Sequence, residues 1–156
     1  MISRILLAVD DSPGGLAAAR VAVDLAAGLG ARLRVVNVVE DGRLAETIEA
    51  VSGARGLRER RGDAAAAVLE HVGELARRAG VQVETCRLEG SPARRILGEA
   101  QAWDSDLTVI ARSQQRRRAG DPYVGGETAQ VLEFTEQPVL VIPTPDPGRR
   151  RRPVRA

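Results

Sequence analysis

The chain has 156 residues and a hydrophobic content of 44%, which suit one domain with its own core and leave no room for a second. Its only cysteine, Cys86, excludes an internal disulfide, and no apolar run approaches the length of a membrane span. The N-terminus leads into strand-like sequence without a signal-peptide pattern. We therefore expect a cytoplasmic protein without a membrane segment.

The net charge of +2 is unevenly distributed along the chain. Arg149–Arg152 and Arg155 supply five positive charges, so the remainder of the chain carries about −3 (2 − 5 = −3). An arginine tail can contact the phosphates of nucleic acid, but a mildly acidic body with few aromatic residues offers neither a matching basic face nor stacking platforms. We interpret residues 1–145 as the domain and residues 146–156 as a disordered tail, and we expect no nucleic-acid partner.

The first elements form a strand, a cap and a helix within a few residues. Ile5–Val9 is a continuous apolar run, as expected of a central parallel strand that is covered on both faces. After Asp10, Ser12 is a good N-cap and Pro13 a good first helical residue, so a helix is predicted from there to about Gly30.

A second strand is predicted at Leu33–Val39. Residues 43–62 lose this regularity, apart from one short amphipathic piece, and are interpreted as a surface insertion at the edge where ligands bind. A long helix follows from about Ala65 to Gly80. Val81–Leu88 alternates polar and apolar residues, which favours an edge strand. His71 lies beside the apolar stripe of the helix and is predicted to be solvated rather than a metal ligand.

The remaining elements begin with a second serine and proline pair at Ser91-Pro92, which predicts a helix as far as Trp103. The pattern then predicts a strand at Leu107–Ala111, an arginine-rich loop at Arg112–Gly126, a helix at Glu127–Thr135 and a last strand at Val139–Ile142.

Five strands alternating with four helices indicate a doubly wound, five-stranded parallel α/β sheet with helices on both faces. Right-handed crossovers and a reversal beside the first strand predict the order 3-2-1-4-5, with a crevice between strands 1 and 4. Asp10 and the Arg112–Gly126 loop should meet there. The apolar strand Val139–Ile142 falls at an edge, so we expect a homodimer in which two copies of this strand pair antiparallel.

Two classes of protein that share this architecture, phosphorylation receivers and flavodoxins, need residues that this chain lacks. A phosphorylation receiver has an acidic pair after strand 1, as Asp10 and Asp11 supply, but also needs an Asp after strand 3 and a Lys near the last strand. The third strand here ends at Leu88-Glu89, and the chain contains no Lys. A flavodoxin needs aromatic residues around its flavin, and this chain has three aromatic residues in all. Neither class fits.

Several ordered blocks resemble the universal stress protein (UspA) family across about residues 2–143. They are Ile5–Pro13, Leu33–Glu40, Leu88–Pro92, Asp106–Ile110 and Glu136–Ile142. The resemblance implies the fold derived above and dimers formed through the last strand. It also implies that ATP is a possible ligand, because one branch of the family binds it.

The family's ATP-binding pattern follows the fourth strand as G-x-x-G, nine residues, then G-[S/T]. Glycines there let backbone N–H groups approach phosphates at a helix N-terminus. Ala111 and Gln114 replace the first two glycines, Gly125 matches the third with one extra spacer residue, and Gly126 replaces the hydroxyl residue. Asp10 and Val38 match the family's aspartate and adenine-side positions.

These departures predict a degenerate site formed by Asp10, Val38, Ala111, Arg112, Gly125 and Gly126. We expect a non-enzymatic stress-response dimer with weak or absent ATP binding, no favoured cofactor and no metal. The alternative is an ATP- or AMP-binding protein that holds phosphates with Gly125, Gly126 and the side chains of Arg112 and Arg116–Arg118. If no nucleotide binds, an interaction module acting through the dimer or the tail remains.

Overall fold

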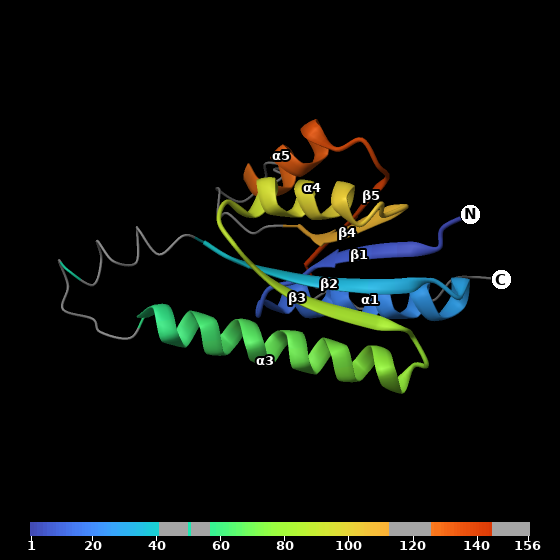
Figure 1. The fold of residues 1–156 in the computed structure, drawn as a ribbon, viewed down its shortest axis with the longest axis horizontal. Coiled ribbons are helices and arrows are strands. Elements are labelled where there is room, and N and C mark those ends of the chain that lie inside the picture. Colours follow the sequence, from blue (N-terminus) through green and yellow to red (C-terminus); the bar gives the residue numbers. More distant parts are fainter. Residues whose placement is uncertain (41–49, 51–56, 113–125, 145–156) are drawn as a thin grey trace.

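The computed structural model describes residues 1–40, 50, 57–112 and 126–144 (Figure 1). The strands are β1 (Arg4–Ala8), β2 (Arg32–Val39), β3 (Val83–Glu89), β4 (Leu107–Ala111) and β5 (Val139–Ile142). The described helices are α1 (Pro13–Leu29), α3 (Leu57–Arg78), α4 (Pro92–Ala102) and α5 (Gly126–Phe134).

The strands form one five-stranded sheet in the order β3-β2-β1-β4-β5, and each neighbouring pair is parallel. Helices α1 and α3 cover one face of the sheet, and α4 and α5 cover the other (Figure 1). The predicted order 3-2-1-4-5 and the doubly wound architecture are confirmed. The chain reverses direction of winding after β3, and this places β1 and β4 side by side at the centre.

The core lies in two layers because alternate residues of each central strand face opposite sides of the sheet. In β1, Ile5 and Leu7 pack with the residues of α1 and α3, whereas Leu6 packs with those of α4 and α5. All three side chains are completely buried. A strand that is covered on both faces must be apolar at every position, which explains the continuous run seen in the sequence.

The boundaries of two elements differ from the sequence prediction. Helix α3 begins at Leu57, so residues 57–62 belong to a helix and not to the insertion. Strand β3 begins at Val83 rather than Val81. The N–H of Val81 donates to the carbonyl of Ala76 and so completes the turn after α3. The amphipathic piece predicted around Leu44, Ile48 and Val51 lies outside the described residues.

Trp103 makes a contact that the sequence did not indicate. The guanidinium of Arg34 lies over the indole ring, 5.0 Å from its centroid, and donates to Glu99 at 2.6 Å as well as to Glu84. This cluster joins β2, β3 and the end of α4. A planar guanidinium suits it because one group can bridge two carboxylates and stack on an aromatic face.

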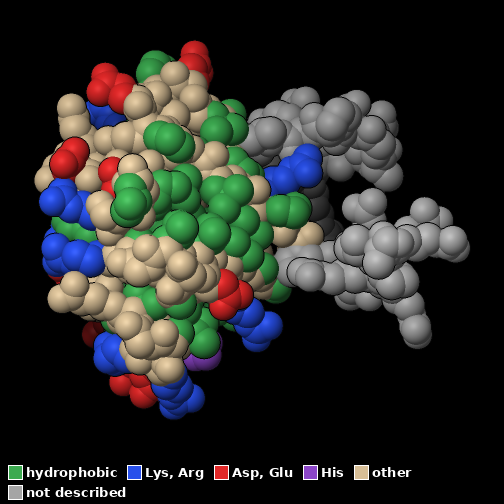
Figure 2. All heavy atoms as spheres, turned by 90° about the vertical axis from the view of Figure 1, so that its right-hand side faces the viewer, with side chains coloured by type: hydrophobic (Ala, Val, Ile, Leu, Met, Phe, Trp, Pro, Cys, Tyr) green, Lys and Arg blue, Asp and Glu red, His purple; other side chains and the backbone are tan. Residues whose placement is uncertain are grey.

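The described surface shows no extended basic area on the face drawn in Figure 2. Arginine and acidic side chains are interspersed there, and hydrophobic side chains gather in the middle. Nothing among the described helices has the length and apolar character of a transmembrane segment.

Candidate functional site

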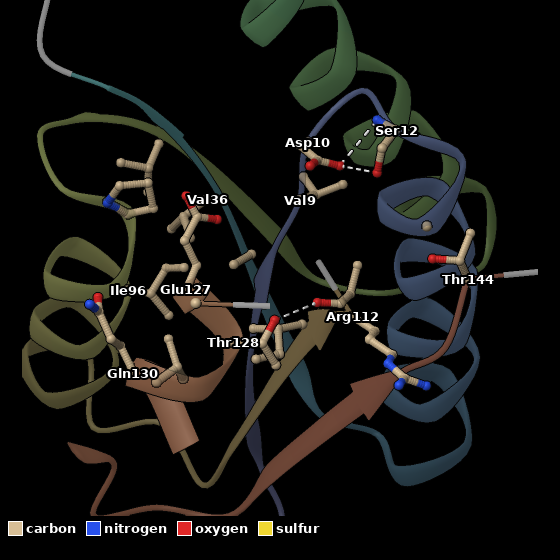
Figure 3. A pocket seen from close by; sticks show the side chains of 18 of the residues that line it. Val9, Asp10, Ser12, Val36, Ile96, Arg112, Glu127, Thr128, Gln130 and Thr144 are labelled. Carbon is tan, nitrogen blue, oxygen red and sulfur yellow. Dashed lines mark hydrogen bonds between the residues drawn. The ribbon is translucent and has the colours of Figure 1, made fainter. Parts of the chain in front are cut away.

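A pocket of about 590 Å³ opens where β1, β2 and β4 end. Its lining comes from these three strands, from the start of α1 and from parts of α4 and α5 (Figure 3). The position is the crevice predicted between strands 1 and 4. Ligands of open parallel sheets bind at such reversal points because the loops of neighbouring strands diverge there.

Asp10 is fixed at one side of the pocket by the start of α1. Its Oδ1 accepts hydrogen bonds from the backbone N–H of Ser12, at 3.1 Å, and from the Ser12 hydroxyl. The same hydroxyl oxygen accepts from the N–H of Gly15 at 3.0 Å and therefore caps the helix. Cap and carboxylate form one unit that orients Asp10 (Figure 3).

The start of α5 forms the opposite wall and is anchored to β4. The Thr128 hydroxyl donates to the carbonyl of Ala111 at 3.4 Å, and Thr128 is almost fully buried. Gly126, the first residue of this helix, also lines the pocket. A β-carbon built on Gly126 meets no described atom within 4 Å, so backbone packing does not require a glycine there.

Three carboxylates line the pocket from three different elements. Asp10 follows β1, Glu40 follows β2, and Glu127 lies in the first turn of α5. Glu127 is exposed as a whole, but partial burial of its carboxyl group raises its pKa, and the carboxylates of Glu40 and Asp10 raise it further. Burial first, and then the two neighbouring charges, thus oppose the ionisation of a carboxyl group that a helix N-terminus would ordinarily favour.

Arg112 is the basic residue among the described lining residues. In Figure 3 its side chain points away from Asp10 and Glu127, toward the end of β5. Its backbone N–H donates to the carbonyl of Ile142 at 2.7 Å, which continues the pairing of β4 with β5. Arg112 therefore lines the pocket, but its guanidinium is directed away from Asp10 and Glu127 (Figure 3).

The inner wall of the pocket is apolar. Valine and isoleucine side chains from the sheet and α4 form it, namely Val36, Val38, Ile96 and Ile110. Val36 is fully buried, whereas Val38, nearer the opening, is half-buried. A wall of this kind is suited to a flat, weakly polar ring system.

Five of the six predicted site residues line this pocket: Asp10, Val38, Ala111, Arg112 and Gly126. Gly125 lies outside the described residues, as do Gln114 and Arg116–Arg118. Sequence reasoning missed Glu40, Glu127 and Thr128. Glu40 directly follows a strand and Glu127 begins a helix after one, so the rule that strand ends converge could have found both.

The comparison with protein families decides the identity of the chain. The model of the universal stress protein family matches residues 1–143. The chain belongs to the universal stress protein family. No curated protein sequence matches it. The resemblance seen in the sequence is therefore confirmed.

Solved structures share the fold of this universal stress protein. A hypothetical protein whose biochemical function was assigned from its structure superimposes with a TM-score of 0.76 at 18% identity, over 94% of this chain and 99% of that one. A universal stress protein in complex with cAMP superimposes with a TM-score of 0.67 at 21% identity, over 92% of this chain and 98% of that one. The universal stress protein from Archaeoglobus fulgidus in complex with dAMP superimposes with a TM-score of 0.62 at 21% identity, over 91% of this chain and 99% of that one.

Within the described ranges, no group of three or more His, Cys, Asp or Glu residues is placed to hold a metal ion. The three pocket carboxylates come from three different parts of the fold. The chemistry that this part of the pocket offers is apolar contact, hydrogen-bond acceptance and negative charge.

Proposed function

We propose that this universal stress protein is a non-enzymatic stress-response protein whose pocket binds ATP weakly or not at all. One observation carries the proposal: Asp10, Glu40 and Glu127 surround the space next to the N-terminus of α5. In an open α/β sheet that terminus is the natural place for a phosphate, because its free N–H groups and dipole attract anions. Here a carboxylate already occupies the first turn.

The magnitude of the repulsion is sufficient to matter. Each pair of like charges about 8 Å apart costs on the order of 1–2 kcal/mol at an effective dielectric constant of about 20–40. A triphosphate carries several negative charges, and three carboxylates face the same pocket. The raised pKa of Glu127 agrees with this argument: burial of the carboxyl group is the main cause, and the charges of Glu40 and Asp10 add to it. The side chain of Arg112 points away from Asp10 and Glu127 (Figure 3), and its single positive charge is outnumbered by the three carboxylates.

The alternative function is ATP or AMP binding through Gly125, Gly126 and arginine side chains. In its favour, the pocket volume lies within the range of about 300–1,000 Å³ that is usual for small-molecule sites. Two relatives of the same fold were solved with cAMP and dAMP. The glycine and arginines of the loop that this alternative needs lie outside the described residues, apart from Arg112 and Gly126.

Calorimetric titration of the full chain with ATP and with AMP separates the two functions. We expect no submicromolar affinity for either nucleotide. The Asp10→Ala variant is the specificity control, because Asp10 lines the pocket and is not part of the core. Submicromolar ATP binding that is lost in Asp10→Ala would overturn the proposal in favour of the alternative.

We further propose that the protein is a cytoplasmic homodimer joined through β5, with a domain of residues 1–145 and a tail of residues 146–156 that binds no nucleic acid. The edge position of β5, its four half-buried apolar residues and the free thiol of Cys86 support these proposals. A sedimentation coefficient of a monomer at micromolar concentration would contradict the dimer.

A further inference from the structure

The pocket combines an apolar wall with an acidic opening, and the two parts favour different chemical groups. The apolar wall can pack against a flat, uncharged ring; it consists of Val36, Val38, Ile96 and Ile110. Asp10 and Glu127 lie toward the opening from opposite walls (Figure 3). A ligand that places a ring against the wall therefore meets carboxylates with its other end.

We infer that the pocket selects an uncharged adenine-type nucleoside over the corresponding nucleotides. This inference rests on the proposed function and names the ligand class for the same pocket. Carboxylates accept hydrogen bonds from the hydroxyl groups of a sugar, and such bonds to an ionised acceptor are among the stronger ones. A phosphate offers no donor when ionised and adds repulsion instead.

Among the described charged groups that line the pocket, the carboxylates outnumber the one cation and favour an uncharged ligand. On α5, Glu127 is charged and Gln130 is neutral, and the loops after β1 and β2 contribute Asp10 and Glu40. The loop after β4 contributes Arg112, whose guanidinium lies toward β5 (Figure 3). An uncharged ligand is not repelled by the carboxylates, whereas each ionised phosphate is repelled by them and binds less tightly.

Adenosine and cAMP are the probes that test the inference. The cyclic phosphodiester of cAMP carries a single negative charge that does not titrate near neutral pH, and its ring closure uses the 3′- and 5′-hydroxyl groups. The pair therefore differs by one charge and by two hydrogen-bond donors. We expect adenosine to bind with a dissociation constant roughly tenfold lower than that of cAMP, which corresponds to one charge repelled by about 1.4 kcal/mol. Calorimetric titration at low ionic strength measures both constants.

Glu127→Gln supplies the matched variant. It removes one carboxylate charge from the pocket while keeping a side chain of the same length, so cAMP should bind several-fold more tightly. Adenosine should bind no more tightly than to the wild type, because it gains nothing from the loss of the charge and can lose an ionised acceptor. Glu133→Gln is the control, because Glu133 lies on the same helix, is exposed and does not line the pocket. We expect it to change neither constant.

A salt series gives a second measurement that needs no variant. Salt screens repulsion between exposed charges, so the affinity for cAMP should increase between about 0.01 and 0.3 M NaCl while that for adenosine stays constant. Equal or tighter binding of cAMP, weakening of cAMP binding with salt, or no adenosine binding at millimolar concentration would each overturn the inference. The absence of adenosine binding would be compatible with the proposed function, whereas submicromolar ATP binding would contradict the proposed function itself.

Discussion

Gly15 lies directly against Asp10: a β-carbon at Gly15 would stand 2.4 Å from both the backbone oxygen and Oδ1 of Asp10. Real β-carbons do not approach other heavy atoms so closely, and one of the two atoms belongs to the backbone. The glycine therefore permits the strand end and the first turn of α1 to meet at the pocket. Gly15 is needed because it has no side chain, and not because its backbone adopts a positive φ.

From this contact we expect Gly15→Ala to lower the free energy of unfolding by about 1–3 kcal/mol, the usual cost of overpacking. Urea denaturation followed by circular dichroism measures it. Gly28→Ala is the control in the same helix, because a β-carbon there meets nothing within 4 Å. It should be neutral or stabilise by up to about 1 kcal/mol. Equal effects of the two substitutions would refute the role assigned to the contact.

Ser12 and Ser91 form a second matched pair. Each precedes a proline that begins a helix, and the sequence gives no reason to distinguish them. The Ser12 hydroxyl accepts from the N–H of Gly15, whereas the Ser91 side chain makes no capping bond. We expect Ser12→Ala to cost about 1 kcal/mol of unfolding free energy and Ser91→Ala less than about 0.5 kcal/mol. A larger loss at Ser91 in thermal or chemical unfolding would contradict this ranking.

Asp106 ties the N-terminus to the start of β4. Its Oδ2 accepts from the backbone N–H groups of Ser3, at 2.7 Å, and Arg4, at 2.9 Å, and from the Ser3 hydroxyl. The backbone bond from Ser3 and then that from Arg4 lower the pKa of Asp106. The ionised form is thus favoured by folding, so this stabilisation is present above the unfolded pKa of about 3.9 and is lost as pH falls through the folded value.

We therefore expect Asp106→Asn to lower stability by about 1–2 kcal/mol at pH 7, with the difference from the wild type shrinking below about pH 4. Unfolding free energies measured between pH 7 and pH 2.5 provide the test. Asp104→Asn is a control, since the Asp104 side chain is 91% exposed and asparagine tolerates its φ of 54°. A difference for Asp106→Asn that does not depend on pH would rule out the carboxylate as the source.

The dimer proposal yields a prediction at Val141. The carbonyl of Pro138 accepts from the N–H of Thr108 in β4, and that of Ile142 accepts from the N–H of Arg112 just after β4. Alternation along β5 therefore directs the N–H of Val141 toward the open edge. Val141→Pro removes a donor that antiparallel pairing with a second copy would use while keeping the pairing with β4. We expect sedimentation to show a monomer for Val141→Pro and a dimer for Val141→Thr. A dimer that persists in Val141→Pro would exclude pairing through this edge.

The fold was predictable because each element carries a local signal. The continuous apolar run of Ile5–Val9 indicated a strand covered on both sides, and the Ser12-Pro13 pair indicated where the next helix begins. Fixed handedness of crossovers then placed strands 1 and 4 together. For the same reason the sequence located Asp10 and Arg112 at one crevice. The start of α3 was missed because residues 57–62, which include three arginines and one glutamate, carry no apolar stripe.

What the sequence determined by itself was therefore the order of the strands, the place of the crevice and the departure of its loop from the glycine-rich pattern. Only the tertiary structure decided the electrical character of that crevice. Glu40 and Glu127 are far apart in the chain, and their interaction depends on the end of β2 lying near the start of α5. The direction of the Arg112 side chain is likewise a matter of packing (Figure 3). Local patterns fix backbone elements, whereas charge interactions depend on distances in space that no local pattern contains.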